Sequence, residues 1–290
     1  MRRVVHLIGA TISGWLEDRA LSMGAALAYY TLFSLGPILL IAIAMAGLVW
    51  GAEEVRLAVV HQIAELIGAS GAEAIDALLA KTRILGAGVV GAVIGVGSFL
   101  LASTALFVQI QDDLNTIFRA KRRSSGGIAT FLRQRMLSFA ILIALGFALL
   151  VSLALDAGLA SATEYFGLDD LEMLYLAMNS FFSWLIAVAI FGLVFSVLPT
   201  ERPSRRSLIA GALLSGTLLI LGKFLIGFYL GRADVVSAYG AAGSLILVLL
   251  WVYYSSQTLF LGAELARALD DRKTQREQAL IAPSRRQWRA

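Results

Sequence analysis

The sequence predicts an all-α, polytopic membrane protein with six transmembrane helices. Hydrophobic residues make up 59% of the chain and charged residues only 15%, against about 25% charged residues in soluble domains. A transmembrane helix needs about 20 consecutive apolar residues. The chain offers six such stretches, at residues 25–49, 84–108, 136–155, 173–200, 207–231 and 235–263.

Residues 1–23 precede the first span and are expected to form an amphipathic helix on the cytoplasmic interface. Val4, Ile8 and Ile12 recur at helical spacing and lead to Trp15, while charged residues lie off this stripe. Apolar and charged faces of this kind are typical of helices that lie at a bilayer surface. Trp15 is expected at the level of the lipid headgroups.

The first span contains Gly36 and Pro37 near its middle. Proline removes one backbone hydrogen bond of a helix. Two interpretations stay open at Pro37, a simple kink or a discontinuous helix whose backbone lines a cavity. Tyr29 and Tyr30 lie in the inner part of the same span and are candidates for a substrate pathway.

A predicted external hairpin of two short helices covers residues 51–83. Val55 and Val59 belong to one apolar stripe, and Ile75 and Leu79 belong to a second, with Gly68 to Gly71 between the two. This pattern indicates two amphipathic helices that lie on the outer face.

The distribution of basic residues predicts the orientation. One orientation places 19 of the 24 Lys and Arg residues in cytoplasmic segments, as the positive-inside rule requires. Both termini are then cytoplasmic. The six spans form one domain, residues 24–268, and residues 269–290 form a basic cytoplasmic tail. Four inner arginines are candidates to hold anionic headgroups: Arg119, Arg122, Arg133 and Arg135.

Lys223 is the most unusual residue, because it is a cation inside the fifth span. A central charge costs about 2.5–3.5 kcal/mol on insertion scales. Lys223 either extends to the outer headgroups or belongs to a buried polar site. Asp156 and Asn179 lie at compatible depths for such a site, whereas Glu264 lies near the opposite edge of the membrane.

The sixth span carries aromatic and polar residues over two turns. Trp251, Tyr254 and Gln257 lie there, and Glu264 follows Gln257 by seven residues and shares its helix face. Tyr239 lies near the start of this span. These side chains either line an inward-facing cavity or make interhelical hydrogen bonds.

The runs Tyr239 to Ser244, Leu249 to Gln257 and Gly262 to Glu264 resemble the signature of the YihY/BrkB family of bacterial inner-membrane proteins. Ala28 to Pro37 and Leu114 to Ile117 support the resemblance. It covers about residues 10–268 and implies a six-helix protein of the bacterial cytoplasmic membrane. Members are often labelled ribonuclease BN.

The residues argue against that label. RNA hydrolysis needs a metal site or an acid/base pair that faces water. His6 and His61 are predicted on opposite sides of the membrane, cysteine is absent, and Asp112 and Asp113 are adjacent, so they point about 100° apart on a helix. We expect no enzymatic activity, no metal and no cofactor.

The leading hypothesis is a transporter or translocator of an amphiphilic, lipid-like or small anionic solute. Lys223, the proline-containing first span and the polar face of the sixth span motivate it. The alternative is a scaffold or envelope assembly factor that does not transport. The expected partner is the bilayer, including anionic lipids, and not nucleic acid; a homo-oligomer stays open.

Overall fold

The computed structural model describes residues 2–67, 69–85, 105–120, 172–230 and 241–281. All elements in these segments are α-helices, which confirms the predicted all-α class. The helices are α1 (Arg2–Glu17), α2 (Ala20–Trp50), α3 (Ala52–Ile67), α4 (Ala69–Leu85), a helix at 105–117, α7 (Glu172–Val197), α8 (Arg205–Leu230) and α10 (Ala241–Ile281).

Three of the described helices are long and apolar enough to cross a membrane, in the stretches Ala177–Val197, Arg205–Ile226 and Leu245–Arg272. They correspond to the fourth, fifth and sixth predicted spans. The first predicted span is α2, in which a shorter apolar stretch, Ala20–Ser34, is recognised. Most of the second predicted span and the whole third span lie outside the described residues, so the count of six stays a prediction.

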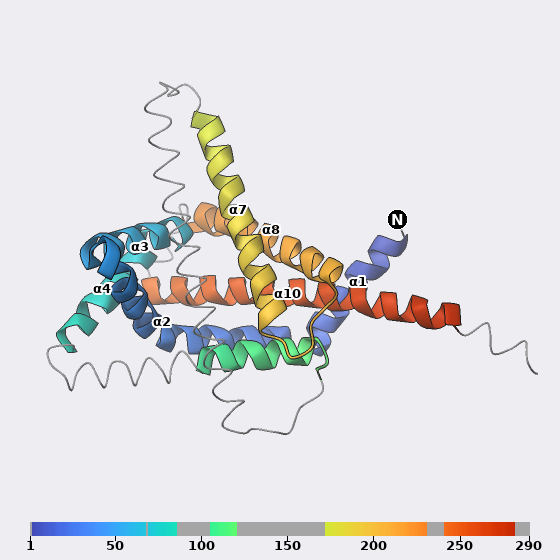
Figure 1. Ribbon diagram of the computed structural model, residues 1–290. Helices are drawn as coiled ribbons and strands as arrows, with labels where there is room; N and C mark the ends of the chain where they lie inside the picture. The colour runs from blue at the N-terminus through green and yellow to red at the C-terminus, as the bar shows by residue number, and fades with distance from the viewer. Residues whose placement is uncertain (1, 68, 86–104, 121–171, 231–240, 282–290) are drawn as a thin grey trace, which may run out of the picture.

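α2 and α10 run side by side, and α8 packs against α10 (Figure 1). α7 crosses α8 and extends away from the α2–α10 pair (Figure 1). The α3–α4 hairpin packs against the end of this group remote from the N-terminus (Figure 1). We call that end the hairpin end and the opposite one, where α1 joins α2, the α1 end.

The hairpin predicted over residues 51–83 consists of two helices, α3 and α4; its external location stays a prediction. Its two apolar stripes are buried because they pack on α2 and α10. The resulting cluster contains Ile43, Val55, Val59, Ile75, Leu79 and Val248. Arg56 of α3 also donates two hydrogen bonds to the Asp76 carboxylate of α4, at 2.9 and 2.7 Å.

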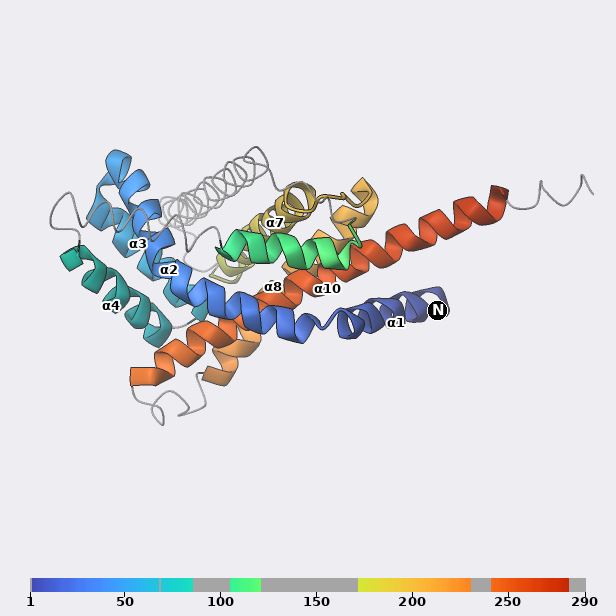
Figure 2. The ribbon, with the colours of Figure 1, turned by 90° about the horizontal axis from the view of Figure 1, so that it is seen from below.

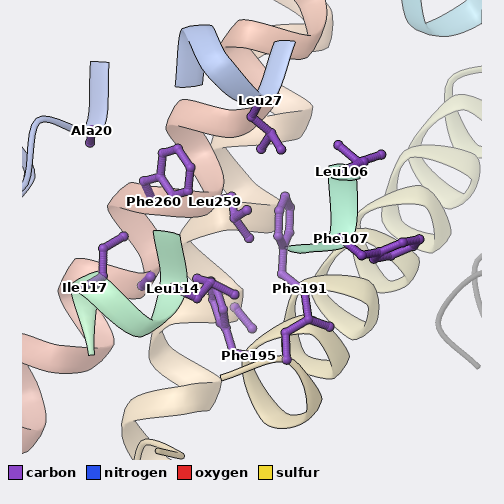
Figure 3. Close-up of a cluster of buried hydrophobic side chains, with 13 residues drawn as sticks. Ala20, Leu27, Leu106, Phe107, Leu114, Ile117, Phe191, Phe195, Leu259 and Phe260 are labelled. Carbon is purple, nitrogen blue, oxygen red and sulfur yellow. The ribbon is translucent and has the colours of Figure 1, made fainter. Parts of the chain in front are cut away.

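A second apolar cluster joins α2, helix 105–117, α7, α8 and α10 nearer the α1 end (Figure 3). Leu114 and Ile117 of helix 105–117 are fully buried between Phe195 and Phe260 of the neighbouring helices. Asn115, between them, accepts a hydrogen bond from the backbone N–H of Thr200 at 2.8 Å. The Leu114 to Ile117 motif therefore holds helix 105–117 against the turn after α7.

α10 is longer than the predicted sixth span. Its 41 residues correspond to about 60 Å, twice the thickness of a hydrocarbon core. The helix passes through residue 269, where a separate tail was predicted, because no glycine or proline follows Gly262 until Pro283. α1 packs along this extension, and the two helices project together from the bundle (Figure 2).

α1 has the predicted amphipathic pattern, and its apolar stripe is exposed at Val4, Val5, Ile8, Ile12 and Leu16. Its opposite face, which includes the buried Thr11, packs on α10 at Gly14. The helix ends at Glu17, six residues before the predicted boundary at residue 23, because Arg19 adopts the left-handed conformation (φ 56°).

Candidate functional site

At the break between α1 and α2, the side chain of Asp18 points into the protein. The backbone N–H of Asp18 still bonds to the Gly14 carbonyl oxygen at 2.9 Å, and α2 begins at Ala20 after the left-handed Arg19. The Asp18 side chain is only 4% exposed. Such burial of a carboxylate requires charged or hydrogen-bonding partners.

Two arginines from distant parts of the sequence supply these partners. Arg119, which follows helix 105–117, places Nη2 2.9 Å from Asp18 Oδ1. Arg267 of α10 places Nη1 3.1 Å from Asp18 Oδ2. The same Arg267 nitrogen lies 3.2 Å from Glu264 Oε2. Asp18 and Glu264 therefore lie next to each other on one guanidinium group.

Glu264 is the more deeply buried acid. Its side chain is 2% exposed, and its Oε1 atom has no hydrogen-bond partner among the described residues. Gly14 of α1 covers it, and a Cβ atom at that position would overlap the carboxylate. We call Asp18, Arg119, Glu264 and Arg267 the inner charge cluster.

Gln257 lies two turns before Glu264 on α10 and connects three helices. Its Oε1 accepts a hydrogen bond from Trp15 Nε1 at 3.0 Å, and its Nε2 donates to the Ala20 carbonyl oxygen at 3.2 Å. Trp15 thus points into the protein, and its expected position at the level of the headgroups stays a prediction. Gly24 of α2 leaves the room that the amide occupies.

Tyr254 and Trp251 are also engaged in packing. The Tyr254 hydroxyl donates to the Leu218 carbonyl oxygen of α8 at 2.5 Å, and its ring fills the space that Gly222 leaves. The Trp251 ring lies 6.3 Å from the Tyr254 ring, measured between centroids. Tyr254 and Gln257 thus both make interhelical hydrogen bonds, which is one of the two alternatives for this face.

The candidates on α2 lie apart from this polar face. Tyr29 is exposed and its ring packs against Phe33, with centroids 4.9 Å apart. Tyr30 is 37% exposed, and its ring contacts that of Tyr29 edge to face. α2 continues as one helix through Gly36 and Pro37, so the structure does not support a discontinuous helix there.

Lys223 lies partly buried on α8 and is not without a partner. It directly follows Gly222, which faces Tyr254 of α10. Tyr254 in turn lies ten residues before Glu264 on the same helix. That separation corresponds to about 15 Å along the helix axis, so Lys223 does not belong to the inner charge cluster. Asn179 is partly buried on α7, and Asp156 and Tyr239 lie outside the described residues.

Among the predicted headgroup arginines, only Arg119 is described. Its side chain is 54% exposed while its guanidinium pairs with Asp18. Arg122, Arg133 and Arg135 lie outside the described residues. The sequence reasoning did not identify Asp18, Gly14 or Arg267 as site residues. The spacing of Glu264 and Arg267, three apart on a helix, is a signal from which this pair could have been found.

A family model described as "Virulence factor BrkB" matches residues 11–287 of the chain. Similar proteins have names of two kinds. A UPF0761 membrane protein of Mannheimia succiniciproducens is 24% identical, with 93% of both chains covered. A ribonuclease-like protein of Bacillus subtilis, YfkH, is 26% identical, over 87% of this chain and 90% of that protein.

A UPF0761 membrane protein of Azotobacter vinelandii is 26% identical over 87% of this chain. The present chain covers only 60% of that relative, which is therefore the longer protein. No solved structure matches the chain.

Proposed function

Since this chain belongs to the BrkB family of membrane proteins, we propose that it is a transporter or translocator of an amphiphilic, lipid-like or small anionic solute. The observation that carries the proposal is the inner charge cluster. Asp18 and Glu264 are almost completely buried, Glu264 within the candidate span Leu245–Arg272 of α10 and Asp18 beside it. Ionisable groups at such positions are costly and typical of substrate or ion pathways.

The cluster joins elements that a transport cycle would have to separate. Asp18 belongs to the α1–α2 junction, Arg119 to the end of helix 105–117, and Glu264 and Arg267 to α10. Ion pairs that bridge helices in this way can form and break as the helices move. We therefore assign to the cluster the role of closing the α1 end of the pathway.

Liposome flux tests this proposal. Labelled anionic lipids, small anions and protons would be followed in liposomes with wild-type protein, Glu264→Gln, Lys223→Ala and the control Gly9→Ala. A Cβ atom at Gly9 would have no packing neighbour within 4 Å, so alanine fits there without a clash. We expect wild-type flux of one solute class, retained in Gly9→Ala and changed at least tenfold in Glu264→Gln. Flux no higher than in protein-free liposomes would reject transport.

The alternative is a scaffold that does not transport. The exposed apolar stripe of α1 favours it, because Ile8, Ile12 and Leu16 lie on a projecting pair of helices that can dock a partner. Under this alternative, charged substitutions on the stripe abolish complex formation, and no solute crosses the membrane.

We also propose that the protein lies in the bacterial inner membrane with both termini in the cytoplasm. The chain has no cysteine, so single cysteines report their own accessibility. A membrane-impermeant maleimide should label His61→Cys on α3 in whole cells, and Ser284→Cys only after lysis. The reverse pattern would overturn the orientation.

A further inference from the structure

Asp18 and Glu264, the two acids of the inner charge cluster, have four carboxylate oxygens, of which only three have a hydrogen-bond or ion-pair donor among the described residues. Asp18 uses Oδ1 for Arg119 and Oδ2 for Arg267. Glu264 uses Oε2 for the same Arg267 nitrogen, while Oε1 is buried and has no partner among the described residues. A buried acceptor without a donor costs about 1–3 kcal/mol, and more when it is charged.

A proton on Glu264 resolves this deficit. A protonated carboxyl group gains an O–H donor, which an ionised one lacks. The adjacent acceptor is the Asp18 carboxylate, which lies on the same Arg267 nitrogen as Glu264, at 3.1 Å against 3.2 Å. Two neighbouring carboxylates that share one proton are a known solution to like-charge repulsion in a buried site.

The charges around the pair agree with one bound proton. Arg267 is mostly buried, whereas Arg119 and Asp271 are more than half exposed. Asp270, one residue before Asp271, binds the N-terminal turn of α8: it accepts hydrogen bonds from the Ser204 backbone N–H and the Ser207 hydroxyl. His6 lies further along α1 beside Arg272. Within the buried part, two acids thus face one arginine.

We propose that Asp18 and Glu264 form a proton-binding site, in which one proton is shared between the two carboxylates. The proposal deepens the proposed function, since it names the proton as the coupling ion of transport. Gly14 closes the site, because its missing side chain lets α1 lie directly on the Glu264 carboxylate. Loss of the proton would leave two buried negative charges, and α1 would have to separate from α10 to admit water.

Infrared spectroscopy of the purified protein in nanodiscs tests the site without any transport. Asp113 is the other buried carboxyl group with an unpartnered oxygen in the described part of the chain, so Asp113→Asn is the background. We expect a protonated carboxyl band at neutral pH that disappears in Glu264→Gln. The matched control Glu17→Gln, next to Asp18 but exposed, should keep the band. An unchanged band in Glu264→Gln, or no band in the background protein, would overturn the proposal.

Two further measurements identify the bound ion and separate the proton site from transport. In the background protein the band should titrate with pH and should not respond to Na⁺; loss of the band on adding Na⁺ would assign the site to that cation instead. In liposomes a pH gradient should drive flux in the wild type and not in Glu264→Gln. A band without flux supports the proton site and rejects transport, whereas flux without a band supports transport and rejects the site.

Discussion

Gly211 of α8 and Gly262 of α10 meet backbone to backbone, so that a Cβ atom on Gly211 would lie 2.5 Å from the Gly262 carbonyl oxygen. Small residues let membrane helices approach closely enough for dispersion and polar contacts to hold them together. Ser215 uses this proximity, because its hydroxyl donates to the Thr258 carbonyl oxygen at 2.9 Å. The glycine pair thus sets where α8 crosses α10.

Gly262→Ala should therefore destabilise the protein. A Cβ at Gly262 would overlap Ser215 Oγ and lie 2.6 Å from the Gly211 carbonyl oxygen. Such overpacking costs about 1–3 kcal/mol, which thermal denaturation in detergent would show as a lower Tm. Gly9→Ala is the control, because open space surrounds Gly9 and alanine favours the helix. Equal Tm values for the two variants would contradict the close crossing.

The Trp15 to Gln257 bond should hold α1 in place. Trp15→Phe removes the indole N–H and leaves the buried Gln257 Oε1 without its donor, at a cost of about 1–3 kcal/mol. We expect faster proteolysis between α1 and α2 in this variant, with the rest of the protein intact. Trp50→Phe, which alters an exposed residue at the far end of α2, is the matched control and should leave the cleavage rate unchanged.

Arg56 and Asp76 should be coupled across the α3–α4 hairpin. Their bidentate geometry holds α3 against α4, and both side chains are partly buried. A double-mutant cycle with Arg56→Ala and Asp76→Ala should give a coupling free energy of about 0.5–1 kcal/mol. The exchange Arg56→Asp with Asp76→Arg should recover part of the loss. Strict additivity of the two single variants would show that the pair contributes nothing.

The sequence predicted the features that depend on local pattern. Apolar stripes placed α3 and α4, because a helix with one apolar face must bury that face on something. A long apolar run also located the span that lies within α10. Its extension to Ile281 was missed, since loss of hydrophobicity after residue 263 was taken as the end of the helix.

The inner charge cluster could not be predicted in the same way. Arg119 and Arg267 both contribute to the positive-inside pattern, and Arg119 is also a predicted headgroup arginine; the topological role is compatible with pairing to Asp18. Asp18 matters because the chain turns at Arg19, and nothing local in the sequence indicates a left-handed arginine. Gly14 and Glu264 are 250 residues apart, so their contact arises only when α1 packs on α10.

Asp113 should make stability depend on pH. It is buried on helix 105–117, beyond the second predicted span, where Gln109 Nε2 donates to its Oδ1 at 2.9 Å while Oδ2 has no partner among the described residues. The pKa of Asp113 is raised to about 6, because burial and the negative charge of Asp112 together raise it more than the Gln109 hydrogen bond lowers it.

The direction in which pH changes the stability of the protein follows from the pKa of Asp113. The pKa of Asp113 is higher in the folded state than the ordinary 3.8, so folding favours the protonated form. This contribution to stability is complete below about pH 4 and is lost as the pH rises through about 6. Above that pH the folded protein carries a poorly solvated carboxylate.

Asp113→Asn should therefore raise the Tm by about 2–4 °C near pH 7.5 and change it little near pH 4. Thermal denaturation in detergent across this range measures the difference, with Glu73→Gln on the exposed surface of α4 as the control. The control should shift the Tm by the same small amount at every pH. A gain for Asp113→Asn that is constant from pH 4 to pH 7.5 would mean that its carboxyl group does not titrate in this range, and that the substitution acts through packing alone.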